Sequence, residues 1–421
     1  MSTSFFRDTL RAGVLLAGAL PLLLAGCGGR QGASSSNTIK FLSMDYDPAS
    51  TAVQKQIVEE FNKQNPDGKV EIEVVNWNDG HQKLQTLISG NQAPDLAIVG
   101  TRWLLEYADA DLLADLSDMD QHGLKLDTFL PGPLDQGRVD GKLLGLPTAV
   151  SVRGLYYNAD MLAKAGVKPP KTWAELRDAA RKVQATNPGV AGFGVQGKEV
   201  ETDLYFYYFL WGAGGEILDA SGKCALDSPA GVEALNFELG LVKDGLTQKE
   251  PTGYNRENLQ DLFTAKKVAM IITGPWFAGM LKKDHPDLKF GVTLPPGKTE
   301  PIAPAAADEI VTFKSTKNPD LARKFLAFWF EDENRIAWDK ASGMLPEKTT
   351  VAASPEMQED ADRKFFMAAL PKGRFVPLHP RWEQMANAVS NAIQGALLGQ
   401  HTPEAALEKA CQDVQQIQGQ P

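Results

Sequence analysis

Cysteine and histidine are scarce in this chain of 421 residues, which contains 3 Cys and 5 His. So few cysteines exclude a small disulfide-rich fold, and the length allows two or three domains that each bury a core of their own. Basic residues are outnumbered, with 43 Lys and Arg against 53 Asp and Glu, so the net charge is −10. That balance disfavours nucleic acid or an anionic membrane surface as a partner bound through bulk charge.

A long hydrophobic run is also missing. The apolar stretch near the N-terminus, Ala12 to Ala25, has about 14 residues, short of the roughly 20 that span a bilayer. It follows two arginines and ends in Leu24-Ala25-Gly26-Cys27, an order typical of a bacterial lipoprotein signal. We expect a signal peptide over residues 1–26 and a lipid on Cys27, which would hold the protein outside the cytoplasm on the cell membrane. The alternative is a plain secretory signal that happens to contain a cysteine.

A Gly/Ser-rich segment over residues 27–37 follows the expected lipid site, and this composition predicts a flexible tether. The other two cysteines, Cys224 and Cys411, do not have a metal or redox spacing. Cys411 shares a helical stripe with Leu407 and Val414, which favours a buried thiol. A disulfide in an oxidising compartment remains open, but we expect two unpaired or structural cysteines.

Short apolar runs alternate with amphipathic helical patterns from residue 38 onward. Strand patterns cover residues 39–42, 70–74 and 95–99, with helical spacing between them. The same alternation continues after residue 150, where Thr172 and Glu175 form a capping-box pattern at a helix start. These patterns predict an α/β protein, and two lobes, each a sheet flanked by helices, fit better than one large sheet.

Most enzyme motifs are absent or lack their context. Gly192–Gly197 matches a dinucleotide-binding pattern but follows a helix, and Gly291–Thr299 imitates a phosphate-binding loop whose spacing is too long. No histidine has a second ligand at helical spacing, so we expect no metal, no cofactor and no histidine-based nucleophile. An acid–base role for Asp308 and Glu309 remains open, beside polar contact or surface charge.

Aromatic residues carry the strongest functional signal. Trp276 follows the turn Gly274-Pro275 at the end of a buried strand pattern, where ligands of open α/β sheets usually bind. Sugar rings stack on aromatic faces while their hydroxyls bond to polar side chains. Other aromatics fall near expected strand ends or helix starts, although many of them are expected to be core residues: Trp77, Trp103, Trp211, Trp382 and the segment 205–211.

Several short motifs occur in a specific order along the mature chain. The motifs are Ala93-Pro94-Asp95-Leu96, Gly145-Leu146-Pro147, Tyr156-Tyr157-Asn158, Pro170-Lys171-Thr172-Trp173-Ala174-Glu175-Leu176, Gly214-Gly215-Glu216-Ile217 and Ala269-Met270-Ile271-Ile272-Thr273-Gly274-Pro275-Trp276. With these motifs in this order, the chain resembles family 1 of the bacterial extracellular solute-binding proteins, the sugar-binding subunits of ABC importers that are similar to maltose-binding protein.

The resemblance implies a two-lobed periplasmic-binding-protein (Venus-flytrap) fold of the class II type. Its lobes would be discontinuous, with residues 38–149 plus 304–345 in the first and 150–303 plus 346–421 in the second. Ligand would bind in the cleft, and closure would present a composite surface to the permease subunits of the importer. The protein would be a monomer without enzymatic activity.

The resemblance also implies site residues. Trp276, with Gly274, matches the family's stacking position, and Arg102 stands where many relatives have an acidic residue. Arg102 therefore binds hydroxyls, an anionic group or an Asp across the cleft. Asp308 and Glu309 replace a Gly-rich stretch and either add acceptors for a polyol or select a different ligand, and Trp382 offers a second stacking face. The remaining expected contacts are Asp45, Asp47, Trp77, Thr101, Trp103, Arg153 and Tyr205.

The sequence leaves four candidate functions for this protein. The first is a lipid-anchored receptor for a mono- to oligosaccharide. The second is a receptor for a glycerophosphodiester or phosphorylated polyol, with Arg102 and Arg153 as anion partners. The third is a secreted glycoside hydrolase that uses two carboxylates, and the fourth is a scaffolding lipoprotein without a small ligand.

Overall fold

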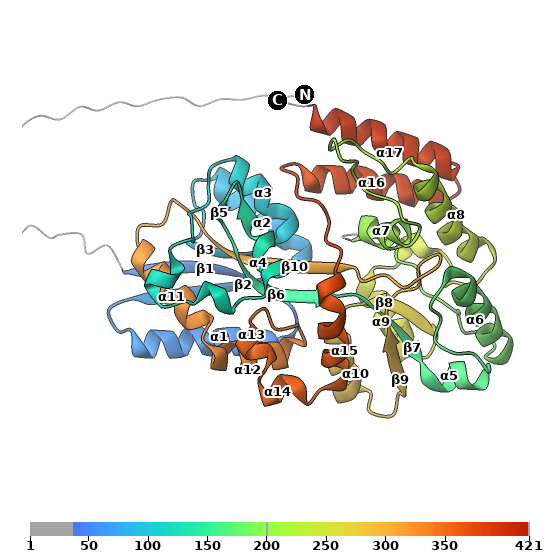
Figure 1. Cartoon of the computed structure of the whole chain (residues 1–421), viewed down its shortest axis with the longest axis horizontal. Helices are drawn as coiled ribbons and strands as arrows, with labels where there is room; N and C mark the ends of the chain where they lie inside the picture. The colour runs from blue at the N-terminus through green and yellow to red at the C-terminus, as the bar shows by residue number, and fades with distance from the viewer. Residues whose placement is uncertain (1–36, 199–200, 420–421) are drawn as a thin grey trace, which may run out of the picture. The chain divides into compact units, whose positions relative to one another are not determined.

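The computed structural model of the protein describes residues 37–198 and 201–419. The expected signal peptide, the lipid site Cys27 and the tether up to Ser36 lie outside the described residues. Within them, no helix combines the length and the apolar character that crossing a membrane requires. Figure 1 shows the elements along the chain. The strands are β1 (Thr38–Asp45), β2 (Lys69–Asn76), β3 (Leu96–Gly100), β4 (Arg138–Val139), β5 (Lys142–Leu143), β6 (Leu146–Val152), β7 (Gly154–Asn158), β8 (Met270–Thr273), β9 (Phe290–Thr293) and β10 (Ala305–Thr312).

The helices are interspersed with the strands up to β10, and only helices follow it. They are α1 (Pro48–Gln64), α2 (Trp77–Ser89), α3 (Thr101–Asp109), α4 (Pro131–Gln136), α5 (Ala159–Lys164), α6 (Trp173–Thr186), α7 (Thr202–Gly212), α8 (Pro229–Lys243), α9 (Arg256–Thr264), α10 (Trp276–Asp284), α11 (Pro319–Trp329), α12 (Asp332–Ser342), α13 (Thr349–Ala352), α14 (Pro355–Gln358), α15 (Ala361–Ala369), α16 (Trp382–Leu397) and α17 (Pro403–Gln418). The capping box expected at Thr172 and Glu175 is confirmed at the start of α6.

A five-stranded sheet has the order β2-β1-β3-β10-β6. Strand β1 is parallel to both β2 and β3, whereas β10 is antiparallel to β3 and β6. Strand β10 comes from late in the chain yet lies between two early strands, with Asp308 opposite Gly100 on one side and Ala149 on the other. The sheet is therefore completed only when a distant segment returns to it.

A separate three-stranded sheet has the order β8-β7-β9, with β7 antiparallel to both neighbours. Strand β8 is buried at all four positions, which agrees with the apolar strand pattern of the sequence. It ends at Thr273, and α10 begins three residues later at Trp276. Trp276, which carries the strongest functional signal in the sequence, therefore lies just beyond the end of β8.

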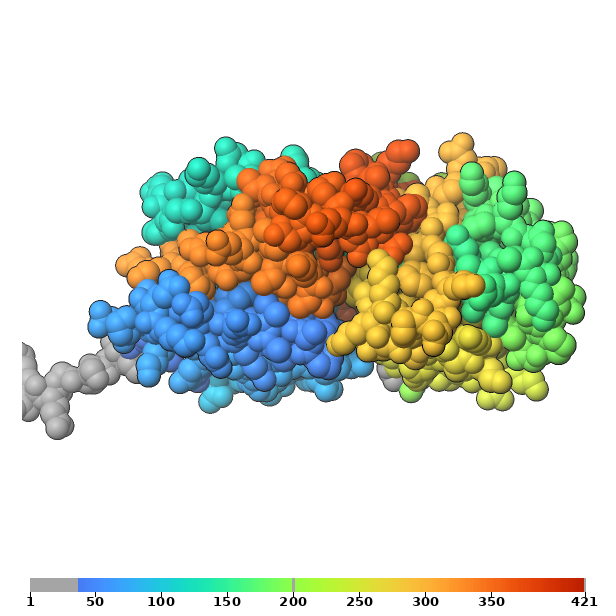
Figure 2. Space-filling model, turned by 90° about the horizontal axis from the view of Figure 1, so that it is seen from below, coloured from blue at the N-terminus to red at the C-terminus, as the bar shows by residue number. Residues whose placement is uncertain are grey.

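The buried hydrophobic residues form two clusters. The first core runs from Ile39 to Ala149 and resumes from Ile310 to Met344, and the second core runs from Val150 to Ala305 and from Leu345 to Val414. The chain therefore passes between the cores in β6, in β10 and once more after α12. Figure 2 agrees, since blue early residues lie beside orange residues while green and yellow residues gather around the second core.

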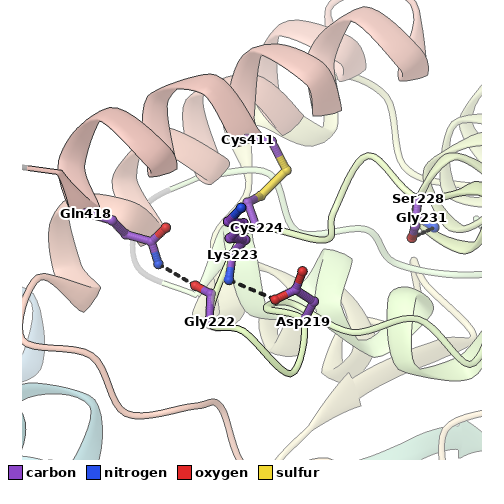
Figure 3. Close-up of a disulfide and its surroundings, with 8 residues drawn as sticks. All are labelled: Asp219, Gly222, Lys223, Cys224, Ser228, Gly231, Cys411 and Gln418. Carbon is purple, nitrogen blue, oxygen red and sulfur yellow. Dashed lines mark hydrogen bonds between the residues drawn. A yellow bond between two sulfur atoms is a disulfide. The ribbon is translucent and has the colours of Figure 1, made fainter.

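The two described cysteines form a disulfide, so our expectation of unpaired cysteines is wrong. Cys224 and Cys411 have Cα atoms 5.3 Å apart although 187 residues separate them in sequence (Figure 3). Helix α17 packs against α8 and brings its Cys411 to the turn that precedes α8. Gln418 adds a hydrogen bond of 2.8 Å to the carbonyl oxygen of Gly222. The prediction that Cys411 is buried on its helix is confirmed. Cys224 lies too far along the chain for the pairing to be inferred from the sequence.

Candidate functional site

Trp276 lies at the boundary of the two cores. It is half-buried and contacts hydrophobic residues of both clusters. A Cβ on Gly274 would lie 1.9 Å from Cζ3 of the Trp276 ring, so the indole folds back over a position that only glycine allows. The hydroxyl of Tyr156 donates a 2.8 Å hydrogen bond to the Gly274 carbonyl oxygen and fixes this turn. The Gly274-Pro275 turn thus holds the indole of Trp276 between the two cores.

Two guanidinium groups lie over the Trp276 ring. The Cζ atoms of Arg153 and Arg256 are each 5.1 Å from a ring centroid of this indole, which is within the range of cation–π attraction. Both arginines form ion pairs with Glu201, at 2.8 Å and 2.9 Å. Burial alone would raise the pKa of Glu201, but the charges of Arg256 and Arg153 hold it below its usual value. The indole is therefore packed by cations whose charge a carboxylate already balances.

A second polar cluster joins the two cores directly. Arg102 on α3 donates through Nε to Oε1 of Glu383 on α16, and the Trp103 indole donates to the same oxygen at 2.9 Å. Nη2 of Arg102 also lies 3.7 Å from Oδ2 of Asp203 on α7. Burial raises the pKa of Asp203 to about 6, against the opposing effect of Arg102. Three roles were expected for Arg102: binding of hydroxyls, of an anionic group or of an Asp across the cleft. The structure shows Arg102 in contact with the carboxylates of Asp203 and Glu383, across the boundary of the two cores.

A cavity of about 420 Å³ opens beside these ion pairs. Its walls come from both cores, and Glu201 links it to the arginines that cover Trp276. The size lies within the range of about 300–1,000 Å³ for small-molecule sites. The lining residues are Asn78, Arg102, Glu201, Asp203, Glu383, Ala386, Asn387, Ser390, Asn391 and Gln394.

An aromatic row lies on the first-core side. Trp77 is 5.5 Å from Tyr46 and 5.5 Å from Trp103, measured between ring centroids. The Tyr46 hydroxyl donates a 2.8 Å hydrogen bond to Asp308 on β10. Burial raises the pKa of Asp308 to about 7, although the Tyr46 hydrogen bond and the charge of Arg153 oppose the shift. Asp308 thus lies on the crossing strand as a carboxyl whose pKa is raised by burial.

Asp45 and Asp47 serve the start of α1 in this structure. Asp47 is the N-cap residue and accepts hydrogen bonds from the backbone N–H groups of Ala49 and Ser50 at 2.7 and 3.1 Å. Asp45 accepts a 2.8 Å bond from the Thr51 hydroxyl. Their expected role as polar ligand contacts therefore competes with a structural one.

Four other expected contacts are buried. Glu309 is 0% exposed, burial raises its pKa well above the usual value, and the Thr101 hydroxyl donates to it at 3.2 Å. Tyr205 is also buried and donates its hydroxyl hydrogen to the Ile272 carbonyl oxygen. Trp382 is 1% exposed and packs edge-on against Tyr207, so the structure does not offer the expected second stacking face. The aromatic residue at the helix start faces the second core instead of the cavity.

Sequence reasoning missed several residues that line this region. These residues belong to no motif, and they are too far apart in the sequence for their proximity to be inferred. They are Glu201, Asp203, Arg256, Glu383 and the amides of α16. One local signal was available for Glu201 and Asp203, since both lie at the start of α7, within four residues of its aromatic segment. Glu201 adopts a backbone φ of 73°, an unusual value for a non-glycine residue that often marks functional positions.

Two cores, crossing strands and a polar cavity between them define a two-lobed binding protein, and comparison with known proteins agrees. The family model described as bacterial extracellular solute-binding protein matches residues 47–336. The chain belongs to this family. A binding protein of Brucella abortus is 37% identical, over 94% of this chain and 95% of the relative. The arabinooligosaccharide-binding protein of Bacillus subtilis is 26% identical, with 94% and 96% covered.

Solved structures of similar proteins share the architecture. An ABC transporter solute-binding protein of Thermotoga lettingae with bound α-D-tagatose has a TM-score of 0.83 at 26% identity, with 91% of this chain and 100% of that chain covered. The maltose-bound MalE3 of T. maritima has a TM-score of 0.82 at 25% identity, with 90% and 99% covered. The expected α/β, two-lobed periplasmic-binding-protein fold is therefore confirmed, and the family places the protein outside the cytoplasm.

Proposed function

We propose that this protein is the substrate-binding subunit of an ABC importer and captures a carbohydrate between its two lobes. The observation that carries the proposal is the position of Trp276, which contacts both cores. Arg153 and Arg256 lie over its ring and pair with Glu201, which lines the polar cavity. An aromatic ring next to carboxylates, amides and guanidinium groups matches the mixed character of a sugar, which has apolar C–H faces and many hydroxyls. The ligands named for the relatives, arabinooligosaccharide and maltose among them, support the same class.

The charge of the site favours an uncharged ligand over a phosphorylated polyol. Arg102 is engaged by Glu383, and Arg153 and Arg256 are both engaged by Glu201. A phosphate would have to compete with these carboxylates for every one of the three guanidinium groups. We therefore retain the sugar as the ligand class and use glycerophosphates as the comparison in the test.

We further propose that the protein performs no catalysis. Of the two carboxylates considered for a hydrolase, Glu309 is fully buried beneath Gly137 and Gly145 and contacts the Thr101 hydroxyl. A glycosidase needs both carboxyl groups to flank the scissile bond. The burial of Glu309 supports binding without turnover, and product analysis of any bound sugar tests this directly.

The proposed setting follows from the N-terminal sequence and from the cores. A lipid on Cys27 and a tether over residues 27–37 would hold a monomeric receptor near the permease subunits. The lobes would comprise residues 38–149 plus 304–345 and residues 150–303 plus 346–421. The two hydrophobic clusters support this division except at Ala305 and Leu345, which pack in the second core. The disulfide agrees with an oxidising, extracytoplasmic location.

A thermal-shift screen tests the ligand class. Purified protein without residues 1–27 is heated with a panel of mono- to tetrasaccharides and, separately, with glycerophosphates. A ligand at a hundredfold excess over its dissociation constant stabilises the native state by about 2.7 kcal/mol. We expect a rise in melting temperature with at least one sugar and with no glycerophosphate. A glycerophosphate-only response would contradict the sugar assignment, and release of smaller sugars from a bound oligosaccharide would indicate a hydrolase.

A further inference from the structure

Trp276 lies against two glycines that come from different parts of the chain. Its ring folds over Gly274, two residues before it. Its backbone lies against Gly343, the residue that ends α12. A Cβ atom on Gly343 would lie 2.7 Å from Cα of Trp276 and 3.4 Å from its backbone nitrogen. Non-bonded carbon atoms pack at about 3.5–4.0 Å, so any side chain at this position would have to displace one of the two backbones.

The contact between Gly343 and Trp276 joins the two cores through their backbones. Gly343 lies where the chain makes its last passage between the cores, since Met344 still packs in the first core and Leu345 packs in the second. On the other side of the contact, Phe277 of α10 packs in the second core. The end of a first-core helix therefore contacts the start of a second-core helix at the residue that we propose to stack on the ligand.

The end of α12 is held in place from several sides. The N–H group of Gly343 donates a 3.0 Å hydrogen bond to the carbonyl oxygen of Asp339, and Nη2 of Arg363 on α15 donates to the same oxygen at 3.0 Å. One turn earlier on α12, Arg335 is 0% exposed and pairs with Glu347 at 2.7 Å. These contacts fix the segment on both sides of Gly343, so α12 is the rigid partner in the contact.

Trp276 is the partner that can be displaced. It is the first residue of α10, where backbone N–H groups have no partner within the helix, and no side chain caps this end. The hydrogen bond from Tyr156 to the carbonyl oxygen of Gly274 holds the turn that precedes Trp276. A shift of the backbone at Trp276 moves the whole indole, and aromatic stacking depends on where the ring face lies.

We propose that Gly343 is a positioning residue for ligand binding, through which the first core sets the position of the indole that the second core supplies. Gly343 is not among the residues that line the cavity, so it acts through Trp276 and not by contact with the ligand. The inference rests on the proposed carbohydrate-binding function and adds a residue that links the arrangement of the two cores to the stacking ring.

Calorimetric titration of paired glycine variants tests this role. Gly343→Ala adds a Cβ at the contact with Trp276. Gly399→Ala is the matched control, because Gly399 also has a φ of 70°, but an added Cβ would meet no atom of the described residues within 4 Å. The two substitutions therefore share the cost of a left-handed backbone and differ in the contact. Gly343→Ala is also combined with Trp276→Ala.

The probes are glucose to maltotetraose and arabinose to arabinotetraose, titrated into the protein without residues 1–27. The sugar that the wild type binds most tightly is then used for every variant. We expect Gly343→Ala to lower the affinity by at least about tenfold and Gly399→Ala to change it by less than about twofold. When Trp276 is already replaced by Ala, no indole remains to be displaced, so Gly343→Ala should lower the affinity by less than about twofold.

Two results would overturn the inference while leaving a sugar receptor intact. Wild-type affinity in folded Gly343→Ala would show that the contact does not position the indole. An equal loss with and without the Trp276 ring would show that Gly343 affects binding by another route. If the wild type binds none of the sugars, the proposed function falls together with this inference.

Arg363→Gln tests the same role if Gly343→Ala does not fold. This change removes the hydrogen bond from α15 to the Asp339 carbonyl oxygen and loosens the end of α12. Lys364→Gln, at an exposed position of the same helix, is the control. We expect Arg363→Gln to lower the affinity by about threefold, and Lys364→Gln to leave it unchanged. Unchanged affinity in Arg363→Gln would contradict the positioning role.

Discussion

Arg102 and Glu383 form an ion pair that joins α3 of the first core to α16 of the second. The two side chains are 14% and 19% exposed, so water and salt screen the pair only in part. The Trp103 indole donates to the same carboxylate at 2.9 Å, which adds a second contact between the cores. Because the partners belong to different cores, the pair stabilises the arrangement in which α3 and α16 are in contact.

Removal of this contact should shift the ligand-free protein toward an open form. We expect Glu383→Ala to weaken the contact between the cores by about 1.5–3 kcal/mol, the range for hydrogen bonds to charged groups. Small-angle X-ray scattering of the sugar-free variant should then give a larger radius of gyration than that of the wild type. Glu216→Ala is the control, because it breaks a more exposed ion pair with Arg374 that does not join the cores. Identical radii for Glu383→Ala and the wild type would show that the pair does not hold the cores together.

The disulfide should contribute substantially to stability. Cys224 and Cys411 close a loop of 187 residues, and replacing both by Ser should lower the free energy of unfolding by about 2–4 kcal/mol. Urea denaturation of the protein without residues 1–27 measures the change. The wild type in reducing buffer should resemble the variant, since reduction removes the same cross-link. An unchanged midpoint in both experiments would argue against the bond.

Glu238 should make the free energy of unfolding decrease as the pH rises from 4.5 to about 8. It is fully buried on α8, neither carboxyl oxygen has a hydrogen-bond partner in the described residues, and burial raises its pKa to about 8. The folded state therefore keeps a proton that the unfolded chain releases near its ordinary pKa of 4.5. The stability linked to this proton is complete below pH 4.5 and is lost as the pH rises toward 8.

Glu238→Gln should remove this pH dependence, because the amide stays neutral at every pH. Thermal melts between pH 5 and pH 9 should show a smaller decline in melting temperature for the variant than for the wild type. Glu233→Gln on the same helix is the control, since its carboxylate is on the surface and pairs with Lys298. Parallel declines for the wild type and Glu238→Gln would mean that Glu238 is ionised at neutral pH.

The lipid site has a direct test in cells. Cys27→Ser should release the protein from the membrane fraction, because the thiol that would carry the lipid is gone. Ser34→Ala, a change within the expected tether, should leave the protein in that fraction. Continued membrane association of Cys27→Ser would contradict lipidation.

The fold was predictable where the signal was local. Strand patterns such as residues 95–99 and the capping box at Thr172 depend on neighbours within a few residues, and both appear at these places. The Gly274-Pro275 turn likewise predicted where Trp276 would lie, because the conformation of a turn depends on its own residues. A local signal for Asp47 was overlooked, since an Asp directly before Pro48 is typical of a helix N-cap.

The rest of the site depends on contacts between distant segments. Arg102 and Glu383 are separated by 281 residues, and Cys224 and Cys411 by 187, so no spacing rule connects either pair. Trp382 shows the same limit, because which face of α16 turns toward Tyr207 is decided by packing in the second core. The cavity-lining amides of α16, those of Asn387, Asn391 and Gln394, could not be predicted either, since Asn and Gln on a helix usually indicate only a solvent-exposed face.

Calorimetric titration of one sugar into the wild type and two Trp276 variants tests the central claim most directly. The sugar is the one that gives the largest rise in melting temperature in the screen, and glycerol 3-phosphate is the comparison ligand. We predict one sugar molecule bound per protein, a loss of affinity of at least about tenfold in Trp276→Ala, a smaller loss in Trp276→Phe, and no heat from glycerol 3-phosphate. Wild-type affinity in Trp276→Ala with an unchanged melting temperature would contradict a carbohydrate site at the boundary of the two cores.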